Sequence, residues 1–185
     1  MINCKDYSVI IMSCDSYSDI WQPLTKSLEM FWSDCPFDIY LCSEEKGFKH
    51  AWIKNIKVGE KAGWGEMLLH VLDKIDTPNV IYLQEDYLLK GKTNNQELDH
   101  LLGIFEKLEA AYLRLLPWPG PDSIHAEYPE VGVCLPESKY RTSLQAAVWD
   151  KEILKEVTER SDDGRFESWS IKRAEKINKK FLGDI

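Results

Sequence analysis

The hydrophobic pattern of the N-terminal part of the chain predicts a strand, a helix and a second strand. Residues 7–13 form a short apolar run, and residues 37–43 alternate between apolar and polar positions, as a strand does. Between them apolar residues recur at helical spacing, and Ser18 stands where an N-cap is expected. The apolar positions of this helix are Trp21, Leu24, Leu28 and Phe31. A β-α-β opening of this kind favours a parallel sheet.

The pattern continues with strands and helices in the alternation typical of an α/β fold. The further expected strands are 56–58, 80–83, 112–116, 131–135 and 143–149. The further expected helices begin at Gly63, at Asn94 with Glu97 at capping-box spacing, after Asp150 as N-cap, and at about Glu167. A long loop with four prolines, residues 117–130, interrupts the pattern. We therefore expect an α/β fold with a mostly parallel sheet flanked by helices.

Composition indicates a single globular domain spanning residues 1–185. An apolar fraction of 44% with seven tryptophans supplies a sizeable core and argues against disorder. A formal net charge of −8 argues against a broad nucleic-acid-binding surface, which would be basic. The five cysteines fit no zinc-site spacing, and we expect them to be reduced. Without an apolar leader or a bilayer-length apolar run, a cytoplasmic protein is expected.

Two adjacent acids, Glu85 and Asp86, interrupt a strongly apolar stretch at the end of the predicted strand 80–83. An unpaired buried charge is unfavourable, so these acids need a metal ion, a basic partner or a place at the surface. Ligand sites of α/β folds lie at strand ends, and Mg²⁺ and Mn²⁺ accept carboxylate oxygens while binding substrate phosphates. The pair is a candidate metal site, and a surface turn is the alternative.

Two other polar segments are candidate ligand contacts. Asp15 follows the first predicted strand and could accept hydrogen bonds from a sugar or base, or equally could cap a turn or helix. Gly63, Trp64, Gly65 and Glu66 open a predicted helix, where glycines permit close backbone approach and the helix N-terminus favours anions. The alternative is that Trp64 is a core residue and Glu66 a first-turn acid that suits the helix dipole.

The C-terminal part contributes one candidate acid and a basic stretch. Glu167 lies between Phe166 and Trp169, where a partly desolvated carboxylate could act as a general base or simply cap a helix. The expected terminal helix has a basic face, which is either solvated or attracted to an anionic membrane surface. Its basic residues are Lys172, Arg173, Lys176, Lys179 and Lys180.

Together these segments resemble small bacterial GT-A-type glycosyltransferase-like proteins of surface-polysaccharide gene clusters. The resemblance spans nearly the whole chain in order and spacing, although no single motif is strict. The segments that carry it are Val9 to Tyr17, Trp21, Cys35-Pro36, Gly63 to Glu66, Glu85-Asp86-Tyr87, Tyr112 to Leu115, Ser143 to Trp149 and Phe166 to Trp169.

The resemblance implies a Rossmann-like sheet that binds a nucleotide-sugar donor and a saccharide or lipid-linked acceptor. Glu85 and Asp86 would occupy the place of the acids that hold Mn²⁺ or Mg²⁺ on the diphosphate, and Glu167 that of the acceptor-activating base. The terminal basic helix would allow peripheral contact with the inner face of the membrane. The residues expected to bind the nucleotide-sugar are Asp15, Tyr17, Trp64, Glu66 and Gln145.

Three functions are therefore distinguished. A metal-dependent glycosyltransferase is expected first, and a non-catalytic GT-A-like binding or assembly protein of the same pathway is the alternative, because Gln84-Glu85-Asp86 is not a strict Asp-x-Asp. A nucleotidyltransferase is disfavoured, because the N-terminal segment lacks the glycine-rich, basic phosphate loop that such enzymes need.

Overall fold

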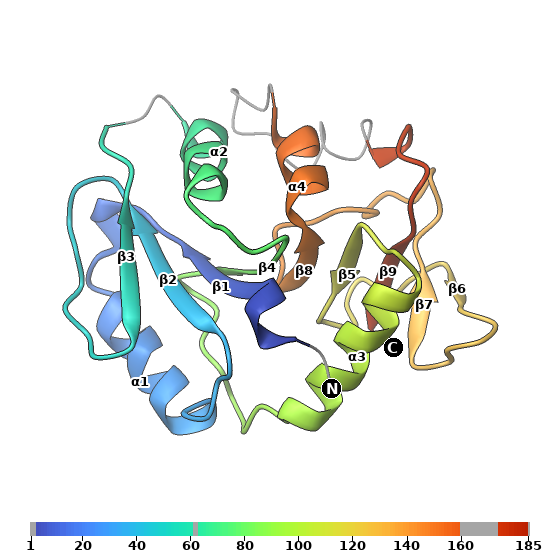
Figure 1. Cartoon of the computed structure of the whole chain (residues 1–185), viewed down its shortest axis with the longest axis horizontal. Helices are drawn as coiled ribbons and strands as arrows, with labels where there is room; N and C mark the ends of the chain where they lie inside the picture. The colour runs from blue at the N-terminus through green and yellow to red at the C-terminus, as the bar shows by residue number, and fades with distance from the viewer. Residues whose placement is uncertain (1–2, 61–62, 160–173, 185) are drawn as a thin grey trace.

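A computed structural model describes residues 3–60, 63–159 and 174–184. In these residues the strands form a nine-stranded sheet in the order β3-β2-β1-β4-β8-β5-β9-β7-β6. Helices α1 and α3 lie on one face of the sheet and α2 and α4 on the other (Figure 1). The expected α/β fold with helices flanking a sheet is confirmed.

The N-terminal half of the sheet is parallel. β1 pairs with β2 and β4, and β2 pairs with β3, all in parallel register. α1 joins β1 to β2, and α2 joins β3 to β4. These two crossover helices pack on opposite faces of the sheet. The bounds are β1 Tyr7–Met12, α1 Trp21–Phe31, β2 Asp38–Ser43, β3 Ile53–Lys57, α2 Trp64–Asp73 and β4 Asn79–Gln84.

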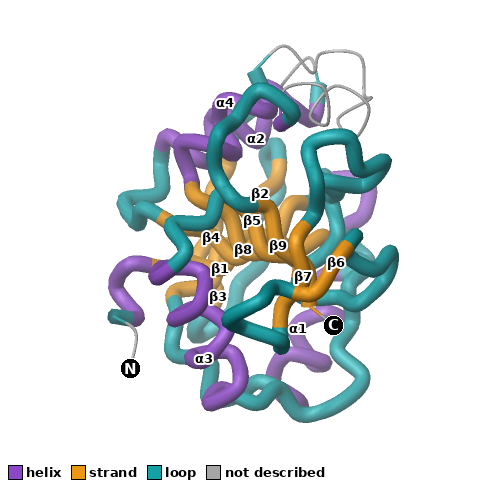
Figure 2. The backbone as a smooth tube through the Cα atoms, turned by 90° about the vertical axis from the view of Figure 1, so that its right-hand side faces the viewer, coloured by secondary structure: helices purple, strands orange, loops and turns teal. Residues whose placement is uncertain are grey.

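The C-terminal half of the sheet is mixed. β8 is antiparallel to both β4 and β5, β5 and β9 are parallel, and β7 is antiparallel to β9 and β6. β8 therefore joins the two halves, in the centre of the strands seen in Figure 2. The bounds are α3 Asn95–Lys107, β5 Tyr112–Arg114, β6 Ser123–Ile124, β7 Val131–Val133, β8 Ala147–Asp150, α4 Lys151–Thr158 and β9 Phe181–Asp184.

Burial on both faces of the sheet explains why the sequences of β1 and β4 are almost continuously apolar. Every residue of β1 is buried, with Val9 and Ile11 in the core beneath α1 and α3 and Ile10 and Met12 in the core beneath α2 and α4. A strand covered on both faces has no solvent-facing alternation. These central strands fix the positions at which their carboxyl ends leave the sheet.

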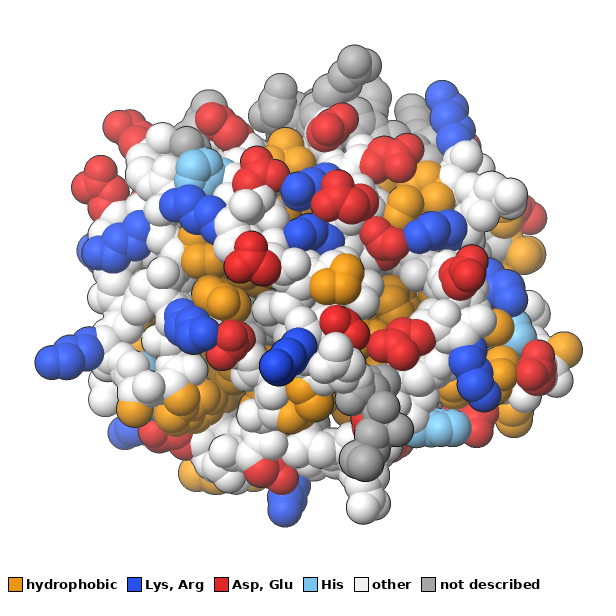
Figure 3. All heavy atoms as spheres, viewed as in Figure 1, with side chains coloured by type: hydrophobic (Ala, Val, Ile, Leu, Met, Phe, Trp, Pro, Cys, Tyr) orange, Lys and Arg blue, Asp and Glu red, His pale blue; other side chains and the backbone are white. Residues whose placement is uncertain are grey.

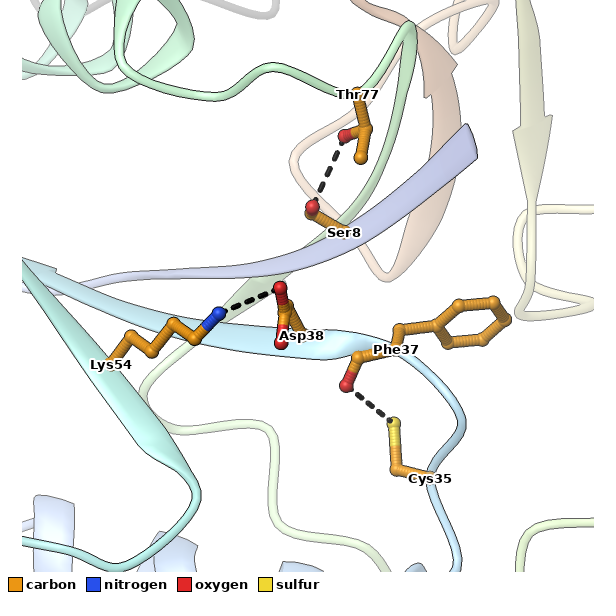
Figure 4. Close-up of polar contacts among 6 residues, drawn as sticks. All are labelled: Ser8, Cys35, Phe37, Asp38, Lys54 and Thr77. Atoms are coloured by element: carbon orange, nitrogen blue, oxygen red, sulfur yellow. Dashed lines mark hydrogen bonds and ion pairs between the residues drawn. The ribbon is translucent and has the colours of Figure 1, made fainter. Parts of the chain in front are cut away.

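Side-chain contacts connect neighbouring segments where β1 and β2 begin (Figure 4). The hydroxyl of Thr77 donates to Ser8 Oγ at 3.1 Å, and Lys54 Nζ donates to Asp38 Oδ2 at 2.7 Å. Thr77 precedes β4 and Lys54 lies in β3, so each pair joins the start of a strand to a neighbouring element.

Helix capping follows the sequence in two places and departs from it in one. Asn94 accepts from the N–H groups at 96 and 97, and Asp150 accepts from Ile153 N, as expected for N-caps. The prediction that Ser18 caps α1 is wrong. A short 3₁₀ turn, η2 (Asp15–Tyr17), precedes α1, and Ile20 takes the N-cap position. Ser18 Oγ instead accepts from Lys46 Nζ at 2.9 Å.

The predicted basic C-terminal helix is wrong for residues 175–184, where the chain turns and then forms β9. Phe181 is buried in the core beneath α2 and α4, whereas Leu182 is buried in the opposite core. Successive residues on opposite faces are the period of a strand, and pairing with β5 overrides the apparent helical spacing. Residues 160–173, which include Glu167, lie outside the described residues.

Candidate functional site

A cavity of about 340 Å³ opens at the carboxyl ends of β1, β2 and β4. The sheet order around these strands is 3-2-1-4, so the chain leaves β1 toward β2 on one side and reaches β4 on the other. Ligands of open α/β sheets bind at such a switch point. The described residues that line the cavity are Met12, Ser13, Cys14, Tyr17, Glu44, Gly63, Trp64, Met67, Gln84 and Glu85.

The segment after β1 forms one wall of the cavity, and α1 holds it in place. Trp21, which is buried at the start of α1, donates its indole N–H to Ser13 Oγ at 2.7 Å. Tyr17 lines the cavity with 52% of its surface exposed. An exposed aromatic ring in the wall of a cavity is suited to contact the flat face of a base or sugar.

Asp15 lies beside this cavity but does not line it. Its carboxylate accepts hydrogen bonds from the backbone N–H groups of Glu45 and Lys46 at 3.0–3.2 Å. Lys46 Nζ donates in return to the Asp15 carbonyl at 2.8 Å. Asp15 therefore fixes the loop that follows β2. It is the N-cap of neither η2 nor α1, and its contact with a sugar or base stays a prediction.

Glu44 is the acid that this loop presents to the cavity, and the sequence reasoning missed it. Its carboxylate accepts a hydrogen bond from Asp15 N–H, and the residue is half-buried in the cavity wall. The signal was available, because Glu44 follows β2 directly as Asp15 follows β1. Neighbouring parallel strands end at the same edge, so an acid after each of them belongs to one site.

We expect Asp15 and Glu44 to differ when each is substituted. Asp15→Ala should lower the free energy of unfolding by about 1–3 kcal/mol, because two backbone N–H groups lose a charged acceptor. Glu44→Gln should leave stability near the native value, because the amide keeps an oxygen acceptor. Urea unfolding of both variants measures this difference. Native stability in Asp15→Ala, together with lost ligand binding, would mean that Asp15 contacts ligand directly.

Glu85 and Asp86 form the turn that ends β4. Tyr87 N–H closes this turn on Gln84 O at 3.1 Å. Glu85 lines the cavity and is half-buried, whereas Asp86 is exposed beside it. Burial raises the pKa of Glu85 above its ordinary value, and the neighbouring charge of Asp86 adds to the rise. The turn therefore directs one of the two predicted metal ligands into the cavity and leaves the other at its margin.

The two carboxylates remain available to an external cation. Within residues 3–60, 63–159 and 174–184, neither Glu85 nor Asp86 forms an ion pair with a basic side chain. The same residues contain no cluster of three or more histidine, cysteine or acidic side chains that could hold a metal alone. Two adjacent carboxylates suit Mg²⁺ or Mn²⁺, which keep several positions for water and substrate phosphates.

The N-terminus of α2 forms another wall of the cavity. Its N-cap, Gly63, has no side chain with which to cap the first turn. Trp64 lines the cavity and packs edge-on against Tyr82 with ring centroids 6.3 Å apart. Glu66 is exposed in the first turn. The positive end of the helix dipole thus lies at a cavity that contains carboxylates but, among its described lining residues, no lysine or arginine.

Gln145 is brought to the same edge of the sheet without lining the cavity. The antiparallel register that pairs Tyr82 with Ala147 carries Gln145 toward the end of β4. Its side-chain oxygen is buried and accepts no hydrogen bond from the part of the chain that the structure describes. A buried acceptor of this kind is unfavourable until a donor reaches it.

Charge over the rest of the surface does not single out another ligand face in Figure 3. On the face shown there, acidic and basic side chains are interspersed over both halves of the sheet. The described part of the chain also has no helix long and apolar enough to cross a bilayer. The polar groups around the cavity, rather than a patch of charge on this face, therefore indicate where a ligand would bind.

Comparisons with known proteins find relatives by structure only. No family model matches the chain, and no curated protein sequence does. TarS from S. aureus, solved as residues 1–349 in complex with UDP, matches with a TM-score of 0.56 and 14% identity over 90% of this chain. Mannosyltransferase PcManGT from Pyrobaculum calidifontis, in complex with GDP-Man and Mn²⁺, matches with a TM-score of 0.54 and 10% identity over 81% of this chain.

A cytidylyltransferase has the same fold. The 2-C-methyl-D-erythritol 4-phosphate cytidylyltransferase from Thermus thermophilus matches with a TM-score of 0.52 and 14% identity, over 87% of this chain and 82% of that chain. By contrast, this chain covers 55% of the TarS structure and 46% of the mannosyltransferase. At these identities the matches show the fold alone, which is that of GT-A glycosyltransferases and related nucleotidyltransferases.

Proposed function

We propose that the protein is a glycosyltransferase that moves a sugar from a nucleotide-diphosphate sugar to a saccharide or lipid-linked acceptor, assisted by Mn²⁺ or Mg²⁺. The observation that carries the proposal is the cavity at the switch point, which combines the Glu44 and Glu85 carboxylates with the N-terminus of α2. The structures of TarS with UDP and of PcManGT with GDP-Man and Mn²⁺, which share the fold, support it.

The donor nucleoside fits the part of the cavity between β1 and β2. Glu44 follows β2, where an acid can accept hydrogen bonds from ribose hydroxyls. Tyr17 and Trp64 offer aromatic surface in the same cavity. Asp15 contributes indirectly in this arrangement, by holding the loop that presents Glu44.

The donor diphosphate fits the part of the cavity between β4 and α2. The positive end of the α2 dipole favours phosphate oxygens, whereas the Glu85 carboxylate would repel them. Glu85 and Asp86 would hold a divalent cation, which would offset that repulsion and supply stabilisation of the charge on the leaving nucleotide.

Two further parts of the proposal concern the acceptor and the cellular setting. Glu167 is proposed as the general base that removes the acceptor hydroxyl proton, on the strength of its sequence context between aromatic residues. The reaction is placed in the cytoplasm, in a bacterial surface-polysaccharide pathway, where lipid-linked acceptors would bring the protein to the inner face of the membrane.

Calorimetric titration with UDP-, GDP- and CDP-sugars, with and without Mn²⁺, tests the proposal. We expect one donor to bind, with higher affinity in the presence of metal, and to lose its sugar to water or acceptor on longer incubation. Absence of binding to every donor contradicts donor use. Binding without any turnover over a panel of saccharide acceptors would instead indicate the non-catalytic binding or assembly protein.

A nucleotidyltransferase is the second candidate, favoured by the near end-to-end match to the cytidylyltransferase. The segment after β1 opposes it. Residues 13–20 contain no glycine, lysine or arginine with which to cradle a triphosphate. Incubation with CTP and sugar phosphates tests this candidate, because a nucleotidyltransferase releases pyrophosphate, whereas the proposed glycosyltransferase does not.

A further inference from the structure

Two arginines are buried on the side of the sheet covered by α2 and α4, at the C-terminal half. Arg114 is 1% exposed and Arg141 is 3% exposed. No carboxylate of the described residues forms an ion pair with either guanidinium. A buried cation without a counter-charge is unfavourable, so each needs an explanation from its surroundings.

Arg114 is explained by the chain around it. Its Nη1 donates to Tyr140 O at 3.0 Å, and its Nη2 donates to Pro119 O. Gly183 leaves room for the guanidinium, since a Cβ at that position would lie 3.3 Å from Arg114 Nη2. Arg114 therefore organises the surrounding loops through both of its Nη atoms, and among the described residues only its buried Nε lacks an acceptor.

The guanidinium of Arg141 has fewer acceptors around it than that of Arg114. Its guanidinium lies over the ring of Phe181, 4.2 Å from the centroid, and Nη2 makes one long hydrogen bond of 3.4 Å to Lys179 O. Its Nε and Nη1 are buried and have no hydrogen-bond partner among the residues that the structure describes. Burial lowers the pKa of Arg141, and Cys134, Glu137 and Glu175 oppose that change. Two donor atoms of Arg141 therefore have no acceptor among the described residues.

A cavity of about 450 Å³ lies against Arg141. Its described walls come from the end of β7 and from the segment that leads into β9. Lys176 and Lys180 line it and are exposed, and Lys179, also in the wall, pairs with Asp150 at 2.7 Å. Glu175 is the one acid among the described lining residues. The cavity therefore carries a net positive charge, and the buried Arg141 lies in its wall.

This cavity is separate from the one at the switch point. Phe181 in its wall pairs with Tyr112, which pairs with Trp149, which in turn pairs with Val80 near the start of β4. The switch-point cavity instead begins at Gln84, the last residue of β4. The two cavities lie toward opposite edges of the sheet, and a donor nucleotide bound in one does not occupy the other.

We propose that the Arg141 cavity binds the phosphoryl group of a second ligand. A phosphoryl group supplies the negative charge that the buried guanidinium of Arg141 lacks, and arginine suits it because guanidinium remains charged when buried. Lys176 and Lys180 add attraction at the cavity margin. The proposal goes beyond sugar transfer, because it adds an anion site that the donor cavity does not need.

The first test is titration of the metal-free protein with inorganic phosphate and pyrophosphate, at constant ionic strength. We expect Arg141→Gln to weaken binding by at least ~10-fold, the effect of losing charged hydrogen bonds. Lys176→Gln combined with Lys180→Gln, both at exposed positions, should weaken binding several-fold without affecting folding. The matched control is Lys26→Gln, an exposed position on α1 remote from this cavity, which should change nothing.

The second test separates two sources of the phosphoryl group. Flotation with phosphatidic acid vesicles, compared with phosphatidylcholine vesicles, detects a lipid headgroup, and the titration detects a soluble phosphate. Dependence of either signal on Lys176 and Lys180 supports the site. Binding in neither assay, or equal binding by the wild type and the folded lysine double variant, overturns it. Titration with the nucleotide-sugar donor should be unchanged in that double variant, so the two proposals fail independently.

Discussion

Glu85→Gln is expected to reduce Mn²⁺-dependent donor affinity by on the order of 100-fold, because it removes the carboxylate that faces the switch-point cavity. A cation held by Asp86 alone would have one exposed ligand from the protein. The donor diphosphate would then meet the cavity with less positive charge to neutralise it. Calorimetry with the donor that binds the wild type, with Mn²⁺ and with EDTA, measures the effect as a loss of metal dependence.

The fold should survive this substitution. Glutamine has nearly the same volume as glutamate, and burial already disfavours the charged form of Glu85, as its raised pKa indicates. Glu45→Gln is the matched control, since Glu45 is exposed in the loop after β2 and does not line the cavity. Retention of full metal dependence in Glu85→Gln, with both variants folded, would remove Glu85 from the proposed metal site.

The parallel half of the fold could be predicted because its signals are local. Residues of β1 and β4 form apolar runs that are too short for helices, and they are buried on both faces as such runs require. Asn94 and Asp150 were predicted as caps from a side-chain type at a fixed spacing, and both accept the expected backbone hydrogen bonds. Neither kind of signal depends on a distant segment.

The C-terminal strand could not be predicted because distant partners decide it. Ile177 and Phe181 have helical spacing in the sequence, yet Phe181 pairs with Tyr112 in β5, far away along the chain. Four residues of strand are too few to outweigh that spacing by local pattern alone. The unpaired donors of Arg141 were hidden for the same reason, because Phe181 covers its guanidinium only after β9 has joined the sheet.

The edge of the sheet at which the candidate cavity opens was predictable, but not every residue that lines it. Acids after β1 and β4 point to this edge, because parallel strands end there together. Which acid enters the cavity depends on backbone orientation. The N–H groups of Glu45 and Lys46 bind the Asp15 carboxylate and leave Glu44 in the wall. No spacing rule in the sequence specifies those two N–H directions.

Trp149→Ala is expected to lower the free energy of unfolding by about 3–5 kcal/mol, a large part of the ~5–15 kcal/mol that stabilises a typical domain. Trp149 is 1% exposed in β8, the strand that joins the two halves of the sheet. The centroid of its ring lies 4.4 Å from the centroid of the Tyr112 ring. Truncation leaves a cavity where β4, β8 and β5 meet.

Urea unfolding of Trp149→Ala against Trp118→Ala measures this effect with a matched control. Trp118 is 79% exposed, so removal of its side chain should change the free energy of unfolding by less than ~0.5 kcal/mol. A loss below ~1 kcal/mol in Trp149→Ala would contradict the packing at this junction. Because β8 pairs with β4 from Asn79 to Tyr82, the segment that leads to the switch-point cavity, the larger loss should also weaken donor binding there, whereas Trp118→Ala should leave it unchanged.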